Sequence, residues 1–260
     1  MTPTPMPLAG RRVLLTRPDD TTGIGDALRV LGAAVIHLPA TRIEPIASGV
    51  QLARAVYMTA DWVVWTSRHA IDVVFAGALP MTRAVPPHFA CVGPATAFAL
   101  RVIGGEATVV ADPPNQDGLL AALVGTATVD GSIVLFPAAV GARTTLEDGL
   151  RSAGAQVMRV DCYDSVPDPG AVEALQRIEA DEAVELVVFA APSAVHAWVA
   201  AVGPTVARGR PAASIGGRTS AACLAYGIPI VAEAARSDGE ALITAIAGWG
   251  RGAPSAWSAD

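Results

Sequence analysis

The sequence contains no lysine, because all 18 of its basic residues are arginine. This absence excludes a Schiff-base mechanism, which needs a lysine amine, and a P-loop, whose lysine binds nucleotide phosphates. Acidic residues number 24, so the formal net charge is -6. We expect no nucleic-acid binding from such a chain, because phosphate neutralisation requires a clustered basic face, and none is visible.

Cysteine and histidine are few and scattered. The three cysteines are odd in number and far apart, which suits a reducing compartment and excludes a metal-ligand spacing. The four histidines are isolated as well. We therefore expect no metal centre. The residues concerned are Cys91, Cys162, Cys223, His37, His69, His88 and His196.

Long hydrophobic runs are also missing, although hydrophobic residues make up 52% of the chain. That proportion excludes intrinsic disorder. The longest uncharged stretch, 186–207, is interrupted by Pro192, Gly203 and Pro204, which favours a strand, a turn and a helix over a membrane span. Residues 1–10 contain three prolines and no positive charge, unlike a signal peptide. We expect a cytoplasmic protein that does not cross a membrane.

The chain repeats itself. The segment 24–45, IGDALRVLGAAVIHLPATRIEP, matches 146–167, LEDGLRSAGAQVMRVDCYDSVP, at an offset of 122. Further matches continue in the same order at offsets of 121–124, including the strand and turn at 63–67 with those at 187–191. Chance similarity in a chain rich in small apolar residues does not account for so many collinear matches. The sequence therefore predicts a duplicated unit.

Each copy alternates short apolar runs with segments of helical periodicity. Near-continuous apolar strands separated by helices indicate parallel sheets that are covered on both faces. The expected class is α/β, with two flavodoxin-like parallel-sheet domains. The first copy is expected to contain strands at 13–15, 35–36, 62–65, 89–92 and 108–110, and helices at 25–31, from His69 and from Ala95.

Two segments break this pattern, at 39–45 and 161–169, and both begin after a strand and contain proline. They are interpreted as linkers. A simple tandem arrangement would instead place the domain boundary near Asp130 and Gly131, and periodicity alone does not choose between these divisions. The segment after Gly250 is expected to be disordered.

Several strands end in small polar residues that open a helix. Ligands bind outside the carboxyl ends of strands in doubly wound sheets, and free N–H groups at helix N-termini bind carboxylate or phosphate. Serine and threonine are also ordinary helix caps, but five such turns in a duplicated framework favour a ligand site. The candidate binding residues are Thr16, Arg17, Thr66, Ser67, Arg68, Thr96, Ser193, Gly216 and Thr219.

No nucleophile–base pair stands out. Ser67 and His69 are two residues apart and would face different sides of a helix. Gly23 and Gly25 lack the third glycine of a dinucleotide fingerprint. The strand-end arginines are either solvated helix starts or an anion clamp; they are Arg17, Arg68, Arg143 and Arg218. Tyr163 lies in the second linker.

Together these segments resemble the uroporphyrinogen-III synthase family, from about Arg12 to Trp249. The resemblance rests on the order and spacing of many pieces, none of which is diagnostic alone. They are VLLTRP (13–18), LPATRIEP (38–45), DWVVWTSRHA (61–70), ACVGPATAFAL (90–100), VLFP (134–137), LEDGLRSAGAQV (146–157), CYDSVP (162–167), VVFAAPSAV (187–195) and ASIGGRTSAACLAYGIPI (213–230).

The resemblance implies one discontinuous domain of residues 1–39 and 168–250 and a second of 46–160. Linkers 40–45 and 161–167 would join them, before a tail at 251–260. It also implies a monomeric enzyme without a metal or organic cofactor, whose substrate is the linear tetrapyrrole polycarboxylate hydroxymethylbilane. Tyr163 matches the linker tyrosine that is often proposed to assist departure of the substrate's hydroxyl group, and it is therefore the expected catalytic residue.

The chain departs from the family pattern in three turns. Ala190 and Ala191 stand where serine or threonine is common, Ala138 and Ala139 where arginine or glycine is common, and Asp164 where arginine is common. Two other functions are alternatives. One is a non-catalytic, two-lobed module that binds a small anion, and the other is a nucleotide-using enzyme with two Rossmann-type lobes.

Overall fold

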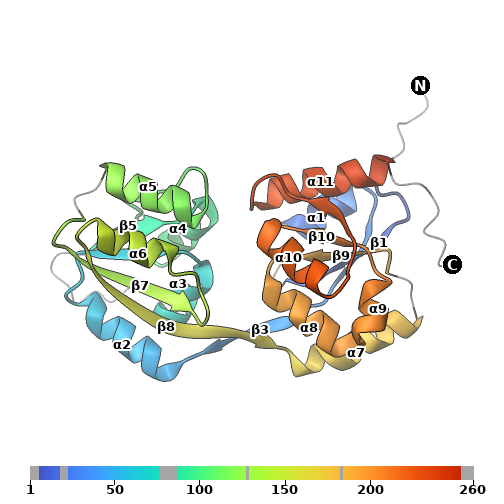
Figure 1. The fold of residues 1–260 in the computed structure, drawn as a ribbon, viewed down its shortest axis with the longest axis horizontal. Coiled ribbons are helices and arrows are strands. Elements are labelled where there is room, and N and C mark those ends of the chain that lie inside the picture. Colours follow the sequence, from blue (N-terminus) through green and yellow to red (C-terminus); the bar gives the residue numbers. More distant parts are fainter. Residues whose placement is uncertain (1–5, 18–22, 77–86, 127–128, 182–183, 253–260) are drawn as a thin grey trace. The chain divides into compact units, whose positions relative to one another are not determined.

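The computed structural model describes residues 6–17, 23–76, 87–126, 129–181 and 184–252. The chain divides into two compact units. Unit 1 consists of Met1–Arg42 and Val166–Asp260, and unit 2 consists of Ile43–Ser165. Each unit is a sheet with helices on both of its faces (Figure 1). The expected α/β class is confirmed.

Unit 1 contains a five-stranded sheet in the spatial order β11-β10-β9-β1-β2, and neighbouring strands are parallel. Counted along the chain from the β2 edge, this order is 2-1-3-4-5, which is the flavodoxin arrangement. The strands are β1 (Arg12–Leu15), β2 (Ala34–His37), β9 (Leu186–Phe189), β10 (Ala212–Ser214) and β11 (Ile230–Glu233).

Unit 2 contains a six-stranded sheet in the order β3-β8-β7-β4-β5-β6. In the internal repeat, β7 and β8 correspond to β1 and β2, and β4, β5 and β6 correspond to β9, β10 and β11. The equivalent strands therefore have the same spatial order in both units, although the chain visits them in a different sequence. The strands are β3 (Thr41–Pro45), β4 (Trp62–Trp65), β5 (His88–Cys91), β6 (Val109–Val110), β7 (Ile133–Ala139) and β8 (Gln156–Pro167).

The two segments interpreted as linkers are strands. The Ile46 N–H donates to the Cys162 carbonyl at 2.8 Å, and the Asp168 N–H donates to the Ala40 carbonyl at 3.1 Å. Residue numbers therefore run in opposite directions along the β3–β8 pair, which makes it antiparallel. Pro45 and Pro167 end their strands, where a missing N–H removes no ladder bond.

Each sheet is covered by an apolar layer on both faces. In unit 1, α1 and α11 cover one face, and α7, α8, α9 and α10 cover the other. In unit 2, α5 and α6 cover one face, and α2, α3 and α4 cover the other. The central strands β4 and β9 are buried along their whole length, as expected for strands packed on both faces.

The predicted helices are present with small shifts at their ends. Gly32, at φ 97°, follows α1 as expected. Arg251 and Gly252, which were expected to belong to a disordered tail, are the last residues of α11, and residues 253–260 lie outside the described part. The helices are α1 (Ile24–Val30), α2 (Ala47–Tyr57), α3 (Arg68–Phe75), α4 (Pro94–Val102), α5 (Gln116–Thr126), α6 (Thr145–Ser152), α7 (Pro169–Asp181), α8 (Pro192–Val202), α9 (Pro204–Arg208), α10 (Gly217–Ala225) and α11 (Gly239–Gly252).

Candidate active-site residues

The turn between β4 and α3 in unit 2 is capped by Ser67. This residue is extended, at φ -157° and ψ 141°, and its Oγ accepts a hydrogen bond from the His69 backbone N–H at 3.1 Å. Serine is a favoured residue at this position, because its side chain satisfies one of the unpaired N–H groups of the first turn. Ser67 thus contacts the backbone of His69 through this bond.

A β-bulge in β8 directs Tyr163 toward α3. The β7–β8 register shifts so that Ala138 pairs with Asp161 and Ala139 with Tyr163, which leaves Cys162 as the extra residue. Regular alternation would turn Cys162 and Tyr163 to opposite faces of the sheet. Both instead belong to the core layer under α2 and α3. Bulges commonly redirect a side chain in this way.

Tyr163 is buried against the residues that open α3. Its side chain forms a hydrogen bond with the side chain of Ser67, and its ring lies 6.4 Å from the His69 ring in an edge-on arrangement. Burial raises the pKa of Tyr163 above its ordinary value, and the hydrogen bond with Ser67 offsets part of that rise. The phenol is 6% exposed. The structure thus joins two candidate residues that the sequence had placed 96 positions apart.

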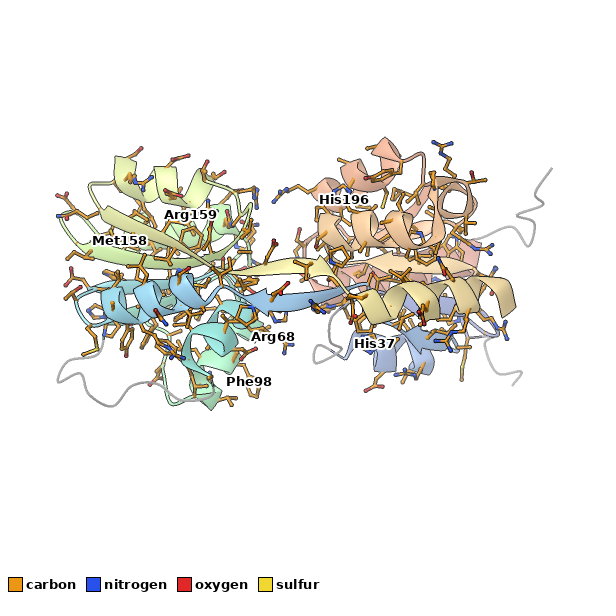
Figure 2. All side chains as sticks on the ribbon, turned by 90° about the horizontal axis from the view of Figure 1, so that it is seen from below. His37, Arg68, Phe98, Met158, Arg159 and His196 are labelled. Carbon is orange, nitrogen blue, oxygen red and sulfur yellow. The ribbon has the colours of Figure 1, made fainter. Side chains whose placement is uncertain are left out.

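The other candidates of unit 2 lie at the same carboxyl edge of the sheet. Thr66 and Arg68 flank Ser67 and are partly exposed, and Arg68 is the first residue of α3 (Figure 2). Thr96 is the third residue of α4 and is 6% exposed. Helix α4 begins after Gly93, and no side chain caps it.

In unit 1, Thr16 and Arg17 follow β1. The Thr16 side chain is fully buried, and its Oγ1 donates to the Val188 carbonyl at 2.8 Å. This hydroxyl hydrogen is therefore engaged inside the protein. Arg17 is partly exposed, and its carbonyl lies 3.0 Å from His37 Nε2.

The remaining candidates of unit 1 lie at the starts of α8 and α10. Ser193 is the second residue of α8, and the capping position before it is Ala191. Gly216 precedes α10 at φ 153°, and an added Cβ there would lie 2.9 Å from Ser237 Oγ. Thr219 is 3% exposed. Neither α8 nor α10 has a side-chain cap, so their first-turn N–H groups suit an anionic ligand.

Comparison with known proteins shows the family to which this chain belongs. The family model described as uroporphyrinogen-III synthase HemD matches residues 24–244. The chain belongs to the uroporphyrinogen-III synthase family. The uroporphyrinogen-III synthase of Synechococcus elongatus is 29% identical over 264 residues, which cover 94% of this chain and 97% of that protein. The Escherichia coli enzyme of the same name is 26% identical over 193 residues, covering 72% and 78%.

Solved structures of uroporphyrinogen-III synthases share the fold. A mutant enzyme from Thermus thermophilus aligns with a TM-score of 0.56 at 18% identity, covering 93% of this chain and 98% of the other. The Helicobacter pylori enzyme aligns with a TM-score of 0.52 at 13% identity, covering 90% and 97%. At these identities the alignments establish the two-domain α/β fold and no residue role.

The sequence did not indicate two features of unit 2 in this uroporphyrinogen-III synthase family member, a hydrogen bond and a buried arginine. The Tyr163–Ser67 hydrogen bond has no signal in the sequence, because the bulge that creates it depends on strand pairing. Arg143, in the loop between β7 and α6, has a buried Nε without a hydrogen-bond partner among the described residues. The sequence indicates for Arg143 either a solvated helix start or part of an anion clamp, and it gives no sign that the side chain is buried.

Two further observations concern the described residues only. They contain no group of three or more histidine, cysteine, aspartate or glutamate side chains arranged to hold a metal ion. Within the same ranges, no helix has both the length and the apolar character needed to cross a bilayer.

Proposed function

We propose that this protein cyclises hydroxymethylbilane to uroporphyrinogen III, with inversion of the last pyrrole ring and loss of water. The observation that carries the proposal is the family match over residues 24–244. The relative from Synechococcus elongatus carries the enzyme's name and covers 94% of this chain, which supports the proposal. The comparisons do not favour the non-catalytic anion-binding module.

We assign the first chemical step to Tyr163. The C–O bond of the hydroxymethyl group breaks with its electron pair on oxygen, and that oxygen takes a proton and leaves as water. The adjoining pyrrole supplies the electrons, and loss of its N–H proton, which restores the phenol, gives the azafulvene. A phenol is protonated at neutral pH and can donate to the departing oxygen, and burial keeps Tyr163 in this form.

Ser67 supports this role of Tyr163. Its Oγ accepts from the His69 backbone N–H, so its own hydrogen can be directed at the phenol oxygen. A donor in that position stabilises the partial negative charge that develops on the phenol as its proton moves to the leaving group. Ser67 would then bind Tyr163 rather than the substrate.

Backbone N–H groups are the proposed ligands of the substrate carboxylates. A net charge of -6 repels a polycarboxylate at long range, so local donors must dominate. Helices α4, α8 and α10 begin at the carboxyl edges of their sheets without side-chain caps. The N–H groups of an uncapped first turn suit carboxylates, although α4 and α8 each have a proline near the start that lacks one donor. Thr96, Ser193, Gly216 and Thr219 lie at these helix starts, and Thr66 and Arg68 lie at the start of α3, which Ser67 caps.

The deciding experiment incubates the pure protein with hydroxymethylbilane and resolves the product isomers. Ring closure without inversion gives isomer I, so excess isomer III over a heat-inactivated control is the expected result. Product that stays isomer I at every protein concentration would refute the proposal. We also propose that the protein is cytoplasmic and that its active species is a monomer. Sedimentation at the assay concentration tests the oligomeric state, and activity confined to a dimer fraction would contradict a monomer.

A further inference from the structure

The loop between β7 and α6, residues 140–144, adjoins Tyr163 in unit 2. The Val140 N–H donates to the Tyr163 carbonyl at 2.9 Å, so the loop and the proposed catalytic residue share a backbone bond. Gly141 turns the chain at φ 69°, and the Ala142 N–H donates to the Ala139 carbonyl. The loop follows the carboxyl end of a central strand, where proteins of this class bind ligands.

Arg159 of β8, which is labelled in Figure 2, binds one carbonyl group of this loop and the carbonyl group of Ala139, the last residue of β7. Its Nη1 donates to the Ala142 carbonyl at 3.0 Å, and its Nη2 donates to the Ala139 carbonyl at 3.5 Å. Asp161 orients the guanidinium, because its Oδ1 accepts from Nε at 3.1 Å and from Nη2 at 3.0 Å. A planar guanidinium can serve several acceptors at once in a fixed geometry, which a lysine ammonium cannot reproduce.

The helix after the loop is tied to the same guanidinium. Glu147, in the first turn of α6, lies 3.6 Å from Arg159 Nη1 and also pairs with Arg151 at 2.5 Å. Two arginines and two carboxylates therefore neutralise one another in this cluster. All three nitrogens of Arg159 have partners within the protein, and its side chain is 17% exposed. This arrangement suits a residue that holds structure rather than one that binds a substrate carboxylate.

We propose that Arg159 is a positioning residue for the cyclisation. It fixes the loop 140–144, and through the Val140 bond it fixes the position of Tyr163. The inference rests on the proposed function and adds a residue outside the strand-end turns. Misplacement of a catalytic group by about 1 Å can cost about 10²-fold in rate. We therefore expect loss of the Arg159 guanidinium to lower kcat by roughly tenfold to 10²-fold.

Arg159→Met tests this, because methionine keeps part of the side chain's length and removes every donor. Arg151→Met is the matched control. Arg151 pairs with the same Glu147 and donates to the Val157 carbonyl, which lies outside the loop. The full-length variants are compared by amide hydrogen exchange of the peptide that spans residues 138–145, by kcat and KM for hydroxymethylbilane, and by thermal unfolding. We expect faster exchange and lower kcat in Arg159→Met alone, with partial recovery in Arg159→Lys.

A second comparison separates positioning from general destabilisation. In a Tyr163→Phe background, Arg159→Met should have a clearly smaller effect on kcat, because the group that it positions has lost its donor. Unchanged exchange of the loop, an equal kcat loss in Arg151→Met, or an undiminished effect in the Phe background would each overturn the proposal. If the parent protein forms no isomer III, the proposed function fails separately, and the exchange comparison still decides whether Arg159 holds the loop.

Discussion

The two units have almost the same backbone at the end of their central strands but different chemistry there. Ser67 after β4 and Ala191 after β9 are equivalent in the repeat, and their dihedral angles are φ -157°, ψ 141° and φ -158°, ψ 152°. Only Ser67 caps its helix. The fold therefore sets the backbone of this turn, and the side chain is an independent choice. In unit 2 the side chain is that of serine, and its hydroxyl group lies beside Tyr163.

The residue that pairs with Ser67 in unit 2, Tyr163, also has a different equivalent in unit 1. Tyr163 matches Thr41 at the repeat offset of 122, and both side chains are buried. The bulge at Cys162 brings Tyr163 under α3. A duplicated framework thus carries a Tyr–Ser pair in one copy and Thr–Ala at the same positions in the other. Catalytic chemistry is expected to be concentrated in unit 2, and the following experiments test this asymmetry.

The largest effect is expected from Gly49→Ala in unit 2. An added Cβ would lie 2.0 Å from the Asp161 carbonyl oxygen, so α2 or β8 must move. We expect a loss of about 3 kcal/mol or more in the free energy of unfolding, at the upper end for overpacking. Ala171, the third residue of α7, is its repeat equivalent in unit 1. Ala171→Gly should cost only about 1 kcal/mol. Urea unfolding measures both, and equal losses would contradict the packing difference.

Tyr163→Phe should lower kcat by about 10²-fold, the low end for proton donation by a side chain, because hydroxymethylbilane loses its hydroxyl readily. Isomer III should remain the product, since ring inversion depends on how the substrate is held. Tyr226→Phe is the control in unit 1, because that phenol pairs with His196 at 3.0 Å and has no proposed part in the reaction. Kinetics with isomer analysis measure both variants. Turnover of Tyr163→Phe equal to that of the parent would show that the ring only packs.

Alkaline pH should destabilise unit 2 more than unit 1. Burial raises the pKa of Cys91, Cys162 and Cys223 to about 12, and two of these thiols lie in unit 2. Above about pH 9 the unfolded chain releases these protons while the folded chain keeps them, so stability falls as pH rises toward 12. Each thiol contributes a slope of about 1.4 kcal/mol per pH unit. Tyr163 adds a loss in the same direction above about pH 10.

Cysteine variants show how much of this alkaline loss of stability each buried thiol causes. Cys91→Ala with Cys162→Ala should remove about twice as much of the alkaline slope as Cys223→Ala removes. Denaturant unfolding at about pH 8, 9 and 10 gives the slopes. If the double variant and the single variant reduce the slope equally, the assignment of the loss to buried thiols is wrong.

The smallest effect concerns the two helix caps. Ser67→Ala should destabilise the protein by about 1 kcal/mol, and Ala191→Ser should stabilise it by a similar amount or less, because the backbone at 191 is already that of a capping residue. Ala190→Ser controls for adding a hydroxyl at the neighbouring position. Thermal unfolding of the three variants provides the comparison. A stabilisation by Ala190→Ser as large as that by Ala191→Ser would exclude capping as the cause.

Local sequence patterns determined the secondary structure and the duplication. The apolar runs at β4 and β9 indicated buried strands, and Gly32 marked the end of α1, because burial on two faces and the left-handed turn constrain the residue types directly. The order and spacing of the family segments predicted the family, and the turns after β4 and β9 could be named as candidate binding turns. These features depend on neighbours in the chain, so the sequence alone determined them.

Only the tertiary structure decided which of these residues meet. The segments at 40–45 and 161–167 form an antiparallel strand pair, the bulge at Cys162 brings Tyr163 to Ser67, and Arg159 reaches the Ala142 carbonyl in the loop after β7. A shift of one residue in strand register reverses the direction of a side chain. Register results from pairing between segments that are distant in sequence. For that reason the sequence could name Tyr163 and Ser67 but could not show that they form a pair.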